Sequence, residues 1–111
     1  MAGNTIIQIV ASQSSHADDE AWNKWYTEVH VPMLFGFKGV KRASRYKLIG
    51  DDPVQAKYLA VYEFETAEDH AAFPKSAAFA AAVEDFENRK EELGFDMKWG
   101  ASYELVSTIE R

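Results

Sequence analysis

Apolar residues recur along the chain with two different spacings, and these spacings predict its elements. Four segments are rich in β-branched and aromatic residues or alternate between apolar and polar residues, which is typical of strands. These segments are 5–11, 40–49, 57–64 and 97–109. Between the first two segments, apolar residues recur every three or four positions, which is the period of a helix. The residues with this period are Trp22, Trp25, Tyr26, Val29 and Met33.

A second helix is predicted before the last strand. From about Ser76, the residues Phe79, Val83, Phe86 and Leu93 fall on one helical face, and Gly94 is placed as the C-terminal cap. The first helix is predicted to break or kink just after His30, because Pro32 disfavours helical geometry at the residue before it.

The resulting order, β-α-β-β-α-β, predicts an α+β protein of the ferredoxin-like class. In this arrangement both helices cover one face of an antiparallel four-stranded sheet. The other face then carries one of two rows of the third strand, either Tyr58, Ala60, Tyr62 and Phe64 or Leu59 and Val61. Both rows are too apolar to remain in water as one patch. We therefore expect a homodimer that covers the open sheet face with a second copy of the chain.

Composition narrows the function classes. The chain has 111 residues, which suits a single domain over 1–111, and a formal charge of −6, which argues against nucleic-acid binding. It has no cysteine, which excludes disulfides, thiol catalysis and cysteine-ligated metals. No apolar run approaches the roughly 18 residues of a membrane span. The sequence thus predicts a cytoplasmic protein with no nucleic-acid or membrane partner.

Several motifs together carry a resemblance to a known family. The segment 22–32 reads WNKWYTEVHVP, with Gly-Val at 39–40, Arg-Tyr at 45–46 and an Ala-Glu-Asp-His segment opening 67–79. This pattern resembles the EthD-like group of small proteins in the dimeric α+β barrel superfamily. The resemblance implies a pocket between the first helix and the sheet, near His30. Some isomerase relatives use a cysteine, so a mechanism carried over to this chain must rely on His, Tyr and Arg.

His30 is the leading candidate for a general acid/base. It follows Tyr26 by one helical turn and Trp22 by two, which predicts that all three line one stripe. A position at a helix C-terminus would favour its protonated form. The competing interpretation is that His30 only caps the end of its helix. Tyr26 is the predicted hydrogen-bond partner of a substrate, and Trp22 a wall of the pocket.

The second predicted strand supplies further candidates. Arg42 and Tyr46 share one face of this strand, and Arg45 lies on the other, so only one of Arg45 and Tyr46 can line a given cavity. Tyr46 is assigned to the pocket with His30 and Tyr26, and Arg45 is interpreted as a structural or interface residue. An arginine that reaches a pocket can clamp a carboxylate or enolate. The substrate-binding candidates are Trp22, Arg42, Arg45, Tyr62 and Trp99.

The remaining histidines, His16 and His70, are interpreted as surface residues. No histidine has the spacing of a helical metal motif, so no metal site is predicted. The sequence also lacks a phosphate-binding loop and a dinucleotide fingerprint, and no cofactor is predicted.

These features favour a small homodimeric enzyme. Its predicted chemistry is proton transfer beside a carbonyl, as in isomerisation, cyclisation or a lyase reaction, on an aromatic or lactone-like metabolite. Two alternatives remain open at this point. One is a cofactor-free or haem-dependent monooxygenase, and the other is a binding protein that holds a small ligand without changing it.

Overall fold

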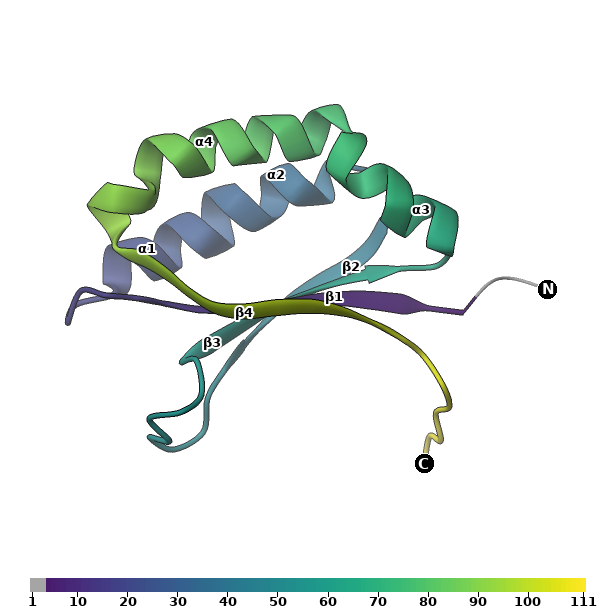
Figure 1. The fold of residues 1–111 in the computed structure, drawn as a ribbon, viewed down its shortest axis with the longest axis horizontal. Coiled ribbons are helices and arrows are strands. Elements are labelled where there is room, and N and C mark those ends of the chain that lie inside the picture. The colour runs from purple at the N-terminus through teal and green to yellow at the C-terminus, as the bar shows by residue number, and fades with distance from the viewer. Residues whose placement is uncertain (1–3) are drawn as a thin grey trace.

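The computed structural model describes residues 4–111 and contains one antiparallel sheet with all helices on one face (Figure 1). The strands are β1 Ile6–Ser14, β2 Val40–Lys47, β3 Tyr58–Phe64 and β4 Phe95–Glu104. Their spatial order is β2-β3-β1-β4. β1 pairs with both β3 and β4, and β2 pairs with β3. The predicted α+β class and ferredoxin-like arrangement are confirmed.

The helices form two runs that lie on the same face of the sheet (Figure 1). The first run comprises α1 Glu20–Trp25, the π-helical turn η1 Tyr26–His30, and α2 Val31–Phe35. The second comprises α3 Ala67–Ala72, the 3₁₀ turn η2 Phe73–Lys75, and α4 Ala77–Leu93. Within residues 4–111, no helix has both the length and the apolar character needed to cross a membrane.

Local chemistry explains where the second run begins and ends. The Thr66 side chain caps α3 by accepting a hydrogen bond from the Asp69 amide. The Ser76 side chain caps α4 by accepting a hydrogen bond from the Phe79 amide. Gly94 ends α4 in the left-handed conformation, with φ of 69°, as predicted for a C-terminal cap.

The first helix does not break after His30, and that prediction is wrong. The chain remains helical through Pro32 to Phe35, and Figure 1 shows α1 and α2 as one continuous rod. Proline has no amide hydrogen, and its ring crowds the carbonyl four residues earlier. The π-turn accommodates it, because here the Val31 amide donates to the Tyr26 carbonyl five residues back.

The last strand is shorter than predicted. β4 ends at Glu104 instead of 109, and the chain beyond it turns away from the sheet (Figure 1). The Leu105 amide makes a final hydrogen bond to the Thr5 carbonyl, at 2.7 Å. Val106 and Ile109 are almost fully exposed, so the alternating apolar residues here do not pack on the sheet.

The core lies between the sheet and the helices. Ala60, Tyr62 and Phe64 of β3 are buried under the helices, so the row Tyr58–Phe64 faces inward. Leu59 and Val61, at the alternate positions, occupy the open face. The β3 register thereby decides which of the two apolar rows is left without a helix above it.

Candidate functional site

The π-turn sets the directions of the side chains on the first helix. Trp22 and Tyr26 lie against the sheet with their ring centroids 5.1 Å apart. The His30 ring also packs edge-to-face with the Tyr26 ring, with centroids 5.2 Å apart, but it stacks on the Trp25 ring, with centroids 4.8 Å apart. In a π-turn, residues five apart come into line, so His30 rotates towards Trp25 and Phe86 of α4. The predicted single stripe of Trp22, Tyr26 and His30 is therefore only partly correct.

His30 is held as a neutral ring. Burial lowers its pKa from the ordinary value of 6.5 to about 4, and the nearby Asp85 carboxylate only partly opposes this. Its Nδ1 atom is buried and has no hydrogen-bond partner. The expectation of a protonated His30 at a helix C-terminus is wrong, because the helix continues past it. For the same reason His30 does not cap the end of a helix.

Arg45 takes the inward position that the sequence interpretation gave to Tyr46. Its guanidinium carbon lies 4.4 Å from the Tyr26 ring centroid, 5.2 Å from that of Trp22 and 5.1 Å from that of Tyr58. Nη1 donates to Thr27 Oγ1 at 2.9 Å. Burial lowers the pKa of Arg45 below its ordinary range, against the effect of the surrounding tyrosines. Arg45 pairs with Ala60, so it shares the helix-covered face with the buried row of β3.

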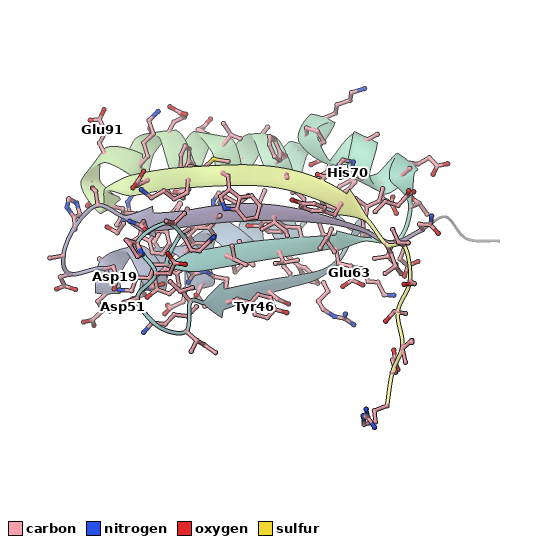
Figure 2. All side chains as sticks on the ribbon, turned by 60° about the horizontal axis from the view of Figure 1, so that its bottom comes forward. Asp19, Tyr46, Asp51, Glu63, His70 and Glu91 are labelled. Atoms are coloured by element: carbon pink, nitrogen blue, oxygen red, sulfur yellow. The ribbon has the colours of Figure 1, made fainter. Side chains whose placement is uncertain are left out.

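Tyr46 lies on the opposite face of the sheet, and grouping it with His30 and Tyr26 is wrong. It pairs with Leu59 and is 57% exposed, and Figure 2 labels it in a view towards the face of the sheet opposite the helices. Trp99 also lies on this open face, and it lines a cavity of about 300 Å³ together with Tyr46 and Leu59. Tyr46 was assigned to the wrong face because neighbouring strand residues point to opposite faces, and the sequence does not show which face the helices cover.

Arg42 is on the open face as well. Its Nη1 donates to Glu63 Oε2 at 3.0 Å in an exposed ion pair. Pairs of this kind contribute little to stability, on the order of 0 to 1 kcal/mol. Arg42 thus lies away from the aromatic cluster around Arg45.

Tyr62 lies beside Arg45 on the helix-covered face of the sheet. It is 2% exposed, and its hydroxyl has no hydrogen-bond partner. Burial raises the pKa of Tyr62 well above its ordinary value, and the Arg45 cation opposes the rise. Burial likewise raises the pKa of Tyr26. Both phenols are therefore neutral hydrogen-bond donors at pH 7.

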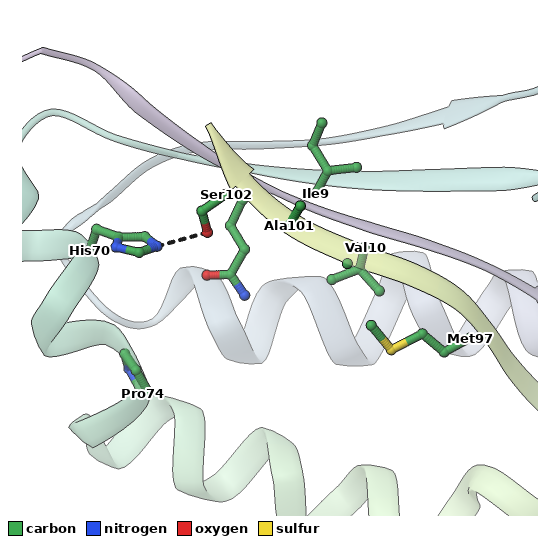
Figure 3. Close-up of a pocket in the computed structure, with 9 residues that line it drawn as sticks. Ile9, Val10, His70, Pro74, Met97, Ala101 and Ser102 are labelled. Carbon is green, nitrogen blue, oxygen red and sulfur yellow. Dashed lines mark hydrogen bonds between the residues drawn. The ribbon is translucent and has the colours of Figure 1, made fainter. Parts of the chain in front are cut away.

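A groove of about 370 Å³ opens between α3, η2 and the β1–β4 part of the sheet (Figure 3). We call it the groove; its lining residues are Gln8, Ile9, Val10, His70, Pro74, Met97, Gly100, Ala101 and Ser102. His70 reaches into it from α3, and its Nε2 lies 2.9 Å from Ser102 Oγ of β4. His70 also makes an edge-to-face contact with the buried Phe64 ring, with the two ring centroids 5.4 Å apart.

The floor of the groove is mainly apolar. A Cβ at Gly100 would lie 2.6 Å from Met97 Cε, so glycine leaves room for the methionine side chain against the strand. The register places Gln8 beside Ser102 on one side and beside Tyr62 on the other. One row of polar side chains thus runs across the helix-covered face from β4 to β3. Within residues 4–111, no three His, Asp or Glu side chains are grouped to hold a metal ion.

Comparison with known proteins identifies the family. The model of a domain of unknown function, DUF4286, matches residues 5–92. The chain belongs to the DUF4286 family. Among curated proteins, none matches the sequence of this DUF4286 protein.

Solved structures share the fold of this DUF4286 chain at low identity. An EthD family protein from Bacillus halodurans is 13% identical, with a TM-score of 0.69 over 96% of this chain and 100% of that one. A hydroxynitrile lyase from Passiflora edulis is 11% identical, with a TM-score of 0.75 over 97% and 99%. A dimeric ferredoxin-like protein from Thermobifida fusca is 8% identical, with a TM-score of 0.65 over 95% and 92%. The resemblance to the EthD-like group is confirmed as a likeness of fold.

The sequence interpretation of this DUF4286 chain missed His70 as a candidate functional residue. His70 and Ser102 are 32 positions apart, and they meet only because α3 packs beside the far edge of the sheet. The segment 67–79 contributed to the family resemblance, but its histidine follows a helix start, where a positive charge is disfavoured.

Proposed function

We propose that the chain is an enzyme that transfers a proton on a small organic molecule bound in the groove, with His70 as general acid/base and no cofactor. The 2.9 Å contact between His70 Nε2 and Ser102 Oγ, at the wall of a mainly apolar groove, carries the proposal. His70 takes the role that the sequence interpretation gave to His30, because His30 packs between two helices and away from the groove.

The pair has the chemistry that this role needs. In the tautomer with its proton on Nδ1, the His70 ring presents Nε2 as an acceptor, and the Ser102 hydroxyl donates to it. A bound substrate gives a proton to that nitrogen, from a hydroxyl or from a carbon beside a carbonyl. The imidazolium then returns the proton to another atom of the same molecule. Such a step is redox-neutral, and a positioned acid/base contributes about 10² to 10⁴ in rate.

The groove also limits the substrate class. Its volume of about 370 Å³ lies at the small end of the range for ligand sites. Val10 and Met97 supply apolar surface, and the Gln8 amide and Ser102 supply the hydrogen bonds that orient a ligand. This combination suits a compact, mainly apolar carbonyl compound of the aromatic or lactone-like class. A fold shared with a hydroxynitrile lyase and an EthD family protein is compatible with such chemistry, although the fold alone does not select it.

A thermal-shift screen followed by a turnover assay tests the proposal. The probes are aromatic acids, muconolactone, polyketide-like phenols, mandelonitrile and haem, applied to the wild type, His70→Gln and His30→Gln. A probe at about 100 times its dissociation constant stabilises the native state by about 2.7 kcal/mol, which the screen detects. For a probe that is turned over, we expect His70→Gln to lose at least 100-fold in rate and His30→Gln to retain more than a tenth.

Three outcomes would overturn the proposal. Binding of every stabilising probe without turnover indicates a binding protein. Turnover that disappears without oxygen indicates a monooxygenase, because proton transfer needs no oxygen. Equal rates for wild type and His70→Gln remove His70 from the chemistry.

We further propose that two copies of the chain associate through their open sheet faces. Leu59 and Val61 lie at the centre of this face, and Tyr46 and Trp99, which flank them, are 57% and 38% exposed. The similar T. fusca protein is described as dimeric, which supports the proposal. Light scattering on the purified protein should give twice the chain mass of 12.5 kDa. Val61→Glu should yield the monomer, and a wild type that is already monomeric at micromolar concentration would contradict the proposal.

A further inference from the structure

Two apolar segments project from the sheet on the side opposite the helices (Figure 1). One is the segment 105–111 after β4, which we call the arm. The other is the segment 48–57 between β2 and β3, which we call the hairpin loop. In the arm, Val106 and Ile109 are almost fully exposed, and in the hairpin loop Ile49 and Val54 are 98% and 80% exposed. Both segments thus carry apolar side chains that the rest of the described chain does not cover.

The strand register places these two segments at opposite ends of the open face. Ile6 at the start of β1 pairs with Glu104, from which the arm leaves the sheet. Ser12, further along β1, pairs with Tyr58, where the hairpin loop enters β3. The stretch of β1 from Ile6 to Ser12 is about 20 Å long at about 3.3 Å per residue. Because the arm also turns away from the sheet, the arm of one copy does not meet its own hairpin loop (Figure 1).

Each end of the open face also has an apolar cavity. The cavity at the hairpin end, which we call the loop cavity, has a volume of about 300 Å³ and is lined by Tyr46, Leu48, Gln55, Ala56, Leu59 and Trp99. The cavity at the arm end, which we call the arm cavity, has a volume of about 250 Å³, and Ile7, Tyr103, Leu105 and Val106 line it. Two flat sheets packed face to face would leave these hollows empty, and the atoms that line an empty hollow lose packing contacts. A partner that covers this face closely therefore has to place side chains in both cavities.

We propose that each copy inserts its arm into the loop cavity of a second copy, with Ile109 as the buried side chain, and lays its hairpin loop against the partner's arm cavity. This inference rests on the association of open faces proposed above and adds the orientation of the two copies. The arm is long enough, because the five residues from Leu105 to Ile109 extend about 16 Å at about 3.3 Å each, whereas packed sheets lie about 10 Å apart.

The symmetry of a dimer favours this orientation. When the arm end of one copy faces the hairpin end of the other, the same two contacts form twice, as a two-fold axis requires. Each projecting segment then meets a cavity. In the opposite orientation, each cavity faces the same cavity of the partner, and the two hairpin loops meet each other. That arrangement leaves both cavities empty.

Disulfide cross-linking gives a direct test, because the chain has no cysteine of its own. Ile109→Cys and Gln55→Cys are combined in the full chain, oxidised with copper phenanthroline and followed on a non-reducing gel. A disulfide requires Cα atoms within about 7 Å of each other. We expect the double variant to give a linked species of twice the chain mass, and each single variant to stay unlinked. The matched control combines Ile109→Cys with Glu63→Cys, at the arm end of the same face, and should link at least tenfold more slowly.

The dissociation constant of the dimer, measured by light scattering over a dilution series, gives a second test. Ile109→Ser should raise it at least tenfold, because each dimer loses two buried isoleucine side chains. Val83→Ser, a change to an exposed residue of α4 on the helix side, should leave it unchanged.

The outcomes separate the inserted arm from the dimer itself. A wild type that is monomeric at micromolar concentration overturns both. A wild-type dimer in which Ile109→Cys alone links as fast as the double variant shows that the arms meet each other, and it overturns the inserted arm only. Faster linking of the Glu63→Cys control, or a wild-type dissociation constant for Ile109→Ser, overturns it equally.

Discussion

Acid should weaken this protein through one histidine. His30 stacks on Trp25 at 4.8 Å with an interplanar angle of 25°, and it also contacts Tyr26 and Phe86. Because burial disfavours the charged ring, its pKa falls from 6.5 to about 4. The unfolded chain exposes the same imidazole to water and so binds the proton more tightly than the native state does.

The magnitude and sign follow from proton linkage. At about 1.4 kcal/mol per pKa unit, a fall from 6.5 to about 4 corresponds to about 3 kcal/mol. The contribution of a neutral His30 to stability is fully present above pH 6.5. It is lost as the pH falls from 6.5 to about 4, since protons bind preferentially to the unfolded chain in this range.

The perturbation is His30→Phe, which keeps a ring on Trp25 and removes the titrating group. Urea unfolding, followed by tryptophan fluorescence from pH 7.5 to 4, gives the free energy of unfolding of both proteins. With a urea dependence of roughly 1 to 3 kcal/mol per molar, 3 kcal/mol moves the midpoint by about 1 M or more. We expect the wild type to lose about 3 kcal/mol more than His30→Phe over this range, while the carboxylates contribute equally to both. His16→Gln, an exchange of an exposed histidine, is the control.

Parallel stability curves for the wild type and His30→Phe would refute the reasoning. So would an NMR titration in which the His30 ring of the native protein has its midpoint near 6.5. Either result would mean that water reaches the ring between the two helices.

Three further stability predictions follow, each measured by urea unfolding. Phe73→Ala should cost about 3 to 5 kcal/mol, because Phe73 is 1% exposed and packs against four aromatic rings. Gly94→Ala should lower the free energy of unfolding more than Gly50→Ala does. Both glycines have positive φ, but only a Cβ at Gly94 would meet another atom, Ser15 Oγ at 2.6 Å. Equal losses of stability would contradict this. Trp25→Phe should cost about 1 to 2 kcal/mol by removing the 2.7 Å hydrogen bond to Asp85, and an unchanged midpoint would show that water replaces this bond.

Local signals predicted the elements of the fold well. Alternation and helical spacing located the four strands and both helical runs, and Gly94 marked the end of α4. The first helix was cut too short because the rule for residues before proline describes a regular α-helix. It does not describe a π-turn, which depends on packing over the sheet. The last strand was extended too far because alternation persists to Ile109 beyond the point where β1 can pair with it.

The candidate site was predicted less completely, because its residues meet only in the folded chain. The alternation of side chains along a strand correctly placed Arg45 and Tyr46 on opposite faces of the sheet. It cannot show which of the two faces the helices cover. That choice depends on the register that buries Tyr62 on the same side as Arg45. The groove depends on contact between α3 and β4, and nothing near His70 in the sequence indicates Ser102.

The π-turn also has a consequence for chain length. Tyr26 and Leu34 are eight residues apart and both buried, whereas a regular helix keeps residues seven apart in line. The turn absorbs the additional residue, so the two ends of the helix meet the sheet as they would in a regular helix one residue shorter. A deletion within 26–30 would therefore leave both ends in place and realign only the stretch between them. This part of the helix is where the chain can change its length by one residue and keep its core.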